Sequence, residues 1–180
     1  MFHLPYTVTV GEKEYPVRTD FRVILEIFVM LDDPDLSDAD KTEALLRMFY
    51  LERPPAEDTE AAVQAFADFV EPRRSGKEEK QKASLIAWDQ DFDLMVAPIN
   101  HILGTECRCL EHLHWHTFLP AYLEIPPESV FARVLRIREK LRTGKKLEKS
   151  ERIWYRRNAD LVNLQTRYSQ SEEEILSKWT

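Results

Sequence analysis

The segment "CRCLEHLHWHTF", residues 107–118, places two cysteines and three histidines within ten positions. Thiolates and imidazoles are the ligands that zinc prefers, and histidines three to five residues apart can chelate one ion. Cysteines separated by a single residue are closer together than the usual turn-based thiolate pair. The weak candidates for metal ligands are Cys107, Cys109, His112 and His116.

A helix explains the same segment without a metal. On a helix, His112 and His116 share one face, while His114 points away from both. We therefore expect the histidines at the boundary of the core, and we predict neither a metal site nor any other cofactor. The buried positions of such a helix would be Leu113, Trp115 and Phe118.

The segment "DQDFD" offers a second constellation, because paired carboxylates can perform acid–base chemistry when their environments separate their pKa values. On a helix, Asp89 and Asp93 share a face and Asp91 lies nearer the apolar stripe. The helix dipole also favours acids in a first turn, and we prefer that interpretation. Neither Cys107 nor any serine lies in a recognisable nucleophile motif. We predict no catalytic residues and no enzyme.

Charge is distributed unevenly along the chain. The net charge is −7 over 180 residues, but residues 133–157 contain 11 Lys and Arg against 3 Glu, a local excess of +8. Such asymmetry can indicate a nucleic-acid surface. Only Trp154 and Tyr155 supply aromatic rings between these cations, whereas base stacking favours interleaved aromatics. We prefer solvated helices with basic outer faces, and we do not expect nucleic acid as a partner.

Several classes of protein are disfavoured by composition. No apolar run approaches the roughly 18 residues needed to span a bilayer, so we expect no membrane partner. The first residues lack the pattern of a secretory signal. The 2 cysteines suit a reducing cytoplasm, and the 4 glycines form no phosphate-binding fingerprint.

Hydrophobic periodicity predicts a mainly α-helical, single-domain bundle over residues 1–180, with a small N-terminal β-hairpin at 4–18. The first helices occupy 20–71, a flexible linker 72–84, and the remaining helices 85–180.

The clearest helix covers residues 88–103 and should end at Gly104. Thr19 and Ser37 are expected to begin the first two helices as N-caps. A long terminal helix is predicted over 148–168. Further helices are expected at 41–51, 58–70, 107–118, 127–142 and 169–180.

The order of these segments resembles the bacteriophage Gp-fifteen family. The similarity begins at "TDFRVILEIFVML", continues through "DQD", and includes "LHWHTF" and the Arg-rich "VLRIREKL". His116 stands where the family usually has a second tryptophan, and Pro98 and Pro120 fall in helices usually free of proline. The residues that carry the motifs are Asp20, Phe21, Arg22, Asp89, Asp91, Gly104, Leu113, His114, Trp115 and Phe118.

The resemblance implies a phage or prophage tail-morphogenesis protein in the cytoplasm of the bacterial host. It implies, more narrowly, a chaperone that shields the tape measure protein during tail assembly. The alternatives are a structural virion component of the tail or neck, and a nucleic-acid-binding helical protein that uses residues 133–157. Oligomeric state is left open. Candidate partner-binding residues are Trp115, Phe118, Trp154, Arg136 and Arg156.

Overall fold

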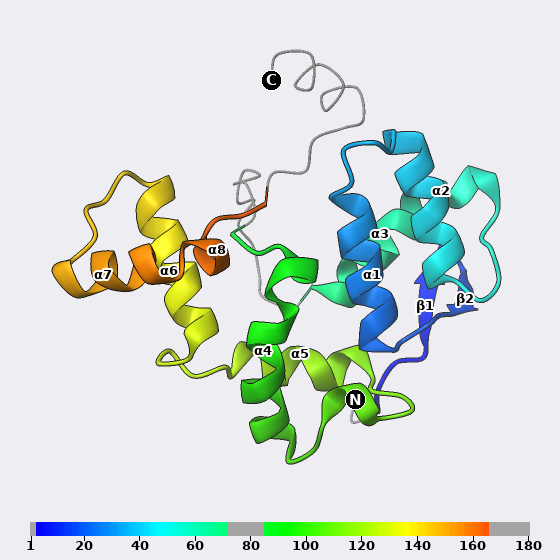
Figure 1. The fold of residues 1–180 in the computed structure, drawn as a ribbon. Coiled ribbons are helices and arrows are strands. Elements are labelled where there is room, and N and C mark those ends of the chain that lie inside the picture. Colours follow the sequence, from blue (N-terminus) through cyan, green and yellow to red (C-terminus); the bar gives the residue numbers. More distant parts are fainter. Residues whose placement is uncertain (1–2, 72–84, 166–180) are drawn as a thin grey trace. The chain divides into compact units, whose positions relative to one another are not determined.

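The protein is described by a computed structural model over residues 3–71 and 85–165, and the mainly α-helical fold with a small β-hairpin is confirmed (Figure 1). Residues 72–84, predicted as a linker, and 166–180, which include the predicted last helix, lie outside the described residues. The described elements are the strands β1 (Thr7–Val10) and β2 (Lys13–Pro16), the 3-10 turns η1 (Ala56–Asp58) and η2 (Cys107–Cys109), and the helices α1 (Phe21–Leu31), α2 (Asp38–Phe49), α3 (Thr59–Val70), α4 (Trp88–Leu103), α5 (Trp115–Leu123), α6 (Val130–Arg142), α7 (Lys149–Arg157) and α8 (Ala159–Val162).

Contacts among the described residues form two compact units. The first unit comprises residues 3–71 and 111–119, and the second comprises 85–110 and 120–165. That residues 1–180 form one domain stays a prediction.

The hairpin of the first unit forms as the sequence predicts. Strands β1 and β2 are antiparallel, with Val8 opposite Tyr15 and Val10 opposite Lys13. Gly11 has a φ of 62°, which a turn between two such strands requires and which glycine adopts without steric cost. Val10 and Tyr15 are buried, so one face of the hairpin belongs to the core.

Three helices complete that core. Helix α1 packs on α2, α2 on α3, and α3 on β1. Aromatic rings fill the centre: the ring centroid of Phe49 lies 5.0 Å from that of Phe66 and 5.2 Å from that of Phe69. Other fully buried side chains of the first unit are those of Phe21, Ile24, Ile27, Trp115 and Phe118.

The caps of the first two helices test the predicted helix starts. Ser37 caps α2, as predicted, by accepting a hydrogen bond from the Asp40 N–H. The prediction of Thr19 as the cap of α1 is wrong, because the Asp20 side chain accepts from the Arg22 N–H instead. Asp20 can do this because its backbone is extended, with φ −66° and ψ 133°.

The second unit contains the predicted helix of residues 88–103, which is α4. Gly104 ends it with a φ of 71° and donates its N–H to the Asn100 carbonyl at 2.8 Å. The helix continues through Pro98, and α5 continues through Pro120. Both prolines are therefore accommodated inside helices.

The long terminal helix predicted over 148–168 is wrong. Helix α7 ends at Arg157, and Asn158 adopts a non-helical φ of −134° while its side chain donates to the Trp154 carbonyl. The chain then forms the short α8, whose Val162 packs with Val134 and Ile137 of α6. The break turns α8 onto α6, which a continuous helix would not allow.

Candidate functional site

The four weak candidates for metal ligands differ in their surroundings. Cys107 of the second unit is buried, which raises the pKa of its thiol, and Cys109 is exposed. In the first unit, the Nε2 of His112 lies 3.1 Å from the Thr19 hydroxyl, and the Nε2 of His116 lies 2.8 Å from the Phe69 carbonyl oxygen. Across residues 3–71 and 85–165, no group of three His, Cys, Asp or Glu side chains could hold a metal ion.

The helix predicted over 107–118 is wrong over residues 107–114, because α5 begins only at Trp115. The preceding residues pair with the start of α1 as an antiparallel bridge between Asp20 and His114. The Phe21 N–H donates to the Leu113 carbonyl at 2.9 Å, and the Trp115 N–H donates to the Thr19 carbonyl at 2.6 Å. These backbone bonds hold the segment extended.

Asp20 joins the two family motifs of the first unit. One carboxylate oxygen accepts from the Arg22 N–H at 3.0 Å, and the other accepts from the Leu113 N–H at 3.0 Å. The carboxylate thus caps α1 and holds a segment 93 residues further along the chain. The guanidinium of Arg22 lies 3.5 Å from the same carboxylate and over the Phe21 ring.

His114 is a neutral structural residue. Its Nδ1 accepts from the His116 N–H at 3.0 Å, so the ring proton lies on Nε2, which donates to the Pro5 carbonyl at 2.8 Å. Burial lowers the pKa of His114 below 6.5, and the neighbouring His116 and His112 lower it further. The ring therefore links the N-terminal segment to the start of α5.

Two predicted partner-binding aromatics are core residues, so their assignment as surface anchors is wrong. Trp115 is 2% exposed and donates its indole N–H to the Val70 carbonyl at 3.2 Å. Phe118 is 0% exposed and stacks on Phe21 with ring centroids 4.5 Å apart. A partner cannot contact either ring without unfolding part of the first unit.

The remaining candidates lie in the second unit. Trp154 is half-buried, with the Arg133 guanidinium 5.4 Å from its ring centroid. Arg136 and Arg156 are exposed and stay candidates for partner contact. Of the 11 cations in 133–157, nine are exposed, which leaves a basic surface on α6, α7 and the loop between them.

The family motif residue Asp91 forms a buried ion pair that the sequence pattern did not predict. Asp91 is 0% exposed, and its two carboxylate oxygens accept from Arg138 of α6 at 2.6 and 2.9 Å. Arg138 also donates to the carbonyls of Leu85, Leu161 and Val162. The sequence held one sign of this pair: Arg138 directly follows Ile137, a residue of the apolar stripe of α6.

The other acids of "DQDFD" do not join this pair. Asp89 is exposed, and the Asp93 side chain is 90% exposed, 4.0 Å from the Arg108 guanidinium. The Asp91 carboxylate accepts hydrogen bonds from Arg138 and from the Ala87 N–H, the latter at 3.0 Å. The arrangement is that of a structural cross-link between helices.

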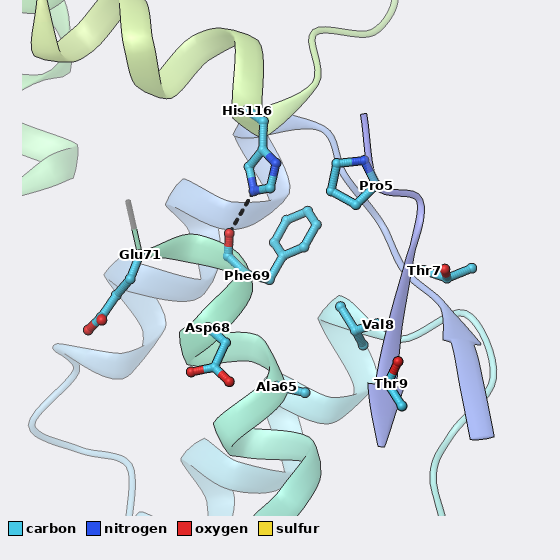
Figure 2. Close-up of a pocket in the computed structure, with 9 residues that line it drawn as sticks. All are labelled: Pro5, Thr7, Val8, Thr9, Ala65, Asp68, Phe69, Glu71 and His116. Carbon is cyan, nitrogen blue, oxygen red and sulfur yellow. Dashed lines mark hydrogen bonds between the residues drawn. The ribbon is translucent and has the colours of Figure 1, made fainter. Parts of the chain in front are cut away.

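A pocket in the first unit is the candidate binding site (Figure 2). It has a volume of about 300 Å³ and lies between β1 and α3, below the start of α5. His116 and Phe69 stand at one end, where the imidazole meets the Phe69 carbonyl. Its lining residues are Pro5, Thr7, Val8, Thr9, Ala65, Asp68, Phe69, Glu71 and His116.

The pocket combines two kinds of surface. Val8, Ala65 and Phe69 provide apolar walls, and the carboxylates of Asp68 and Glu71 provide negative charge. None of the nine lining residues is Lys or Arg. Such a site suits a ligand that carries both apolar groups and hydrogen-bond donors of positive charge.

No helix in the described part of the chain is long and apolar enough to cross a bilayer.

Comparison with known proteins shows the family of the chain. No curated protein and no solved structure matches the chain significantly. A model of the family described as Bacteriophage Gp15 protein matches residues 2–102, more than half of the chain. The match contains the motifs at Asp20 and Asp91, while Leu113 to Phe118 lie beyond it. The chain therefore belongs to the Bacteriophage Gp15 protein family, and this membership indicates a phage-related structural or morphogenesis protein.

Proposed function

We infer that the protein is a non-enzymatic tail assembly chaperone of a phage or prophage, which shields the tape measure protein in the cytoplasm of the bacterial host. The observation that carries this proposal is the family match over residues 2–102. A tape measure protein is a long, largely helical chain, and its apolar stripe would aggregate if it stayed exposed before the tail tube closes around it. A reversible partner with a modest interface would prevent this aggregation.

The surface of the first unit supports such a role. Residues 3–71 contain 16 Asp and Glu against 6 Lys and Arg, and this net charge of −10 keeps a complex dissolved. Large apolar side chains stand exposed among these charges: Leu4 is 42%, Tyr6 57% and Leu51 60% exposed. They offer apolar contact area to a helix stripe.

Coexpression with a tape measure fragment tests the proposal directly. The fragment should become more soluble and should copurify with the protein, whereas an unrelated helical protein of similar length should not. Leu51→Asp should weaken copurification, because it places a charge in the apolar contact. The matched control is Leu123→Asp in the second unit, where the leucine is 49% exposed. An insoluble fragment that never copurifies would contradict the proposal.

Mass spectrometry of purified particles separates a chaperone from a structural virion component. A chaperone should be absent from mature particles, whereas a component of the tail or neck should be present in stoichiometric amount. Stoichiometric presence would replace the proposal with the structural alternative.

The basic surface of α6 and α7 supports a second candidate function, the binding of nucleic acid. Nine exposed cations lie within residues 133–157. Binding through phosphate contacts would weaken steeply with rising salt. A filter-binding titration with double-stranded DNA at several salt concentrations measures that slope, and Arg136→Gln should reduce it. A flat salt dependence would remove this candidate.

A further inference from the structure

The outer edges of β1 and β2 differ in their backbone hydrogen-bond partners. The Val17 N–H donates to the Tyr6 carbonyl at 3.0 Å, which makes these residues a hydrogen-bonded pair. Hydrogen-bonded and non-hydrogen-bonded pairs alternate along an antiparallel ladder. Val8 and Val10 therefore also direct their backbone groups toward β2, and the N–H and C=O groups of Thr7 and Thr9 point to the opposite edge of β1.

The outer edge of β2 already has a partner. The Leu51 N–H donates to the Pro16 carbonyl at 3.0 Å, and the Arg18 N–H donates to the Phe49 carbonyl at 2.8 Å. Val17 and Tyr50 form an isolated antiparallel bridge on the same side. Among the described residues, no strand pairs with the outer edge of β1.

The pocket lies along that open edge. Side chains of consecutive strand residues point to opposite faces, so a pocket lined by Thr7, Val8 and Thr9 together follows the edge of the strand. No residue of β2 lines it, and Figure 2 shows β2 on the other side of β1 from α3. Val8 points from β1 toward Ala65 of α3.

We propose that the outer edge of β1 and the adjacent pocket bind an extended, positively charged peptide segment of another protein by strand addition. The backbone of the segment pairs with Thr7 and Thr9, as in other cases where a peptide extends a sheet. Alternate side chains enter the pocket against Val8 and Phe69, and cationic side chains reach the carboxylates of Asp68 and Glu71. This proposal does not depend on the chaperone role.

Charge selects this occupant over a second copy of the chain. Pairing two β1 edges would bring together two surfaces that each carry a net charge of −10 over residues 3–71. A basic segment, in contrast, gains from the acids at the pocket. Light scattering distinguishes the two occupants, because only self-pairing changes the mass of the protein in the absence of peptide.

Amide chemical shifts of the full chain test the proposal with a defined probe. The probe is a short alternating Lys–Val peptide, added at about 1 mM, the range expected for a weak single-strand contact. The amides of Thr7, Thr9 and Asp68 should shift, and an alternating Glu–Val peptide of equal length should leave them unchanged. A Lys–Val peptide N-methylated at alternate residues should also leave them unchanged, because it cannot pair with a strand edge.

Variants of the chain separate strand addition from general charge attraction. Thr7→Pro removes an N–H that points away from β2, so the hairpin should persist while peptide binding is lost; Thr7→Val, which keeps that N–H, should bind normally. Asp68→Lys should weaken binding by about three- to ten-fold. The matched control on α3 is Glu60→Lys, because Glu60 is exposed but does not line the pocket.

The outcomes are decisive in either direction. Shifts confined to β1 and the pocket, abolished by N-methylation of the peptide, support strand addition even if Thr7→Pro fails to fold. The proposal is overturned if the Lys–Val peptide causes no shift, if the N-methylated peptide binds equally well, or if the protein is a dimer through β1.

Discussion

Replacing Arg138 tests whether the buried pair with Asp91 holds the second unit together. Arg138 donates five hydrogen bonds, two to Asp91 and one each to the carbonyls of Leu85, Leu161 and Val162. Arg138→Met fills much of the same volume but donates nothing. The substitution leaves a buried carboxylate without its counter-ion and three carbonyls without this donor.

The expected loss of stability follows from the loss of the Arg138 hydrogen bonds. Removing one partner of a buried ion pair typically costs about 3–5 kcal/mol, because the other charge stays desolvated and uncompensated. In a chain of this size, such a loss lowers the melting temperature by about 6–20 °C. An exposed pair, in contrast, contributes about 0–1 kcal/mol. Arg138 is 5% exposed and Asp91 is 0% exposed, so the larger figure applies.

Urea denaturation and hydrogen exchange measure this loss. The matched control is Arg136→Met on the same helix, where the arginine is exposed and the expected change is within about 0.5 kcal/mol. Amide hydrogen exchange should become faster in α4, α6 and α8, which the hydrogen bonds of Arg138 join. If Arg138→Met and Arg136→Met destabilise the chain equally, the buried pair does not hold the unit together and the reasoning is refuted.

Further predictions concern the first unit and a helix end. Because burial lowers the pKa of His114 below 6.5, the unfolded chain binds the proton more readily. The contribution of His114 is complete above about pH 6.5 and is lost as the pH falls toward the lowered pKa, by at most about 1.4 kcal/mol per pH unit. Urea denaturation between pH 5 and pH 7.5 should show this slope, and His114→Gln should flatten it while the exposed control His101→Gln should not. Asp20→Ala should lower the free energy of unfolding by about 2–4 kcal/mol, because α1 loses its cap and the Leu113 N–H loses its acceptor. Asp20→Asn keeps the cap, so an equal loss of stability in that variant would argue against capping. Gly104→Ala should cost about 1–2 kcal/mol in thermal unfolding through its φ of 71°, since nothing lies within 4 Å of the added Cβ, and an unchanged melting temperature would contradict this.

Local patterns predicted the elements whose ends are marked by local chemistry. Helix α4 was predicted at its observed bounds because its apolar stripe has helical spacing and Gly104 can adopt a left-handed conformation. Ser37 was recognised as a cap for a similar reason, since its hydroxyl bonds a backbone group three residues away. The hairpin followed from strict alternation around Gly11.

Long-range pairing explains what the sequence did not reveal. The residues before α5 were predicted as helix because Leu113 and Trp115 suit one, but the Thr19 and Asp20 backbones hold this segment as an extended bridge. Asp91 was placed near the apolar stripe, but its partner lies 47 residues away and no local pattern names it. The pocket was missed for the same reason, because it depends on which edge of the hairpin remains open.

In the first unit, the motif residues stabilise the fold, and the residues that line the pocket are available for binding. The polar groups and rings of the motif residues contact one another and nearby backbone groups. These residues are Asp20, Phe21, His114, Trp115 and Phe118. Through His114 and Pro5 this cluster fixes the segment that leads into β1, and His116 fixes the end of α3 through the Phe69 carbonyl. Both walls of the pocket are thereby attached to the motif. Asp20, Phe21, His114, Trp115 and Phe118 do not line the pocket, so substitutions there should weaken peptide binding only in proportion to the loss of folded protein. Substitutions at Asp68, which lines the pocket, should weaken binding without changing stability.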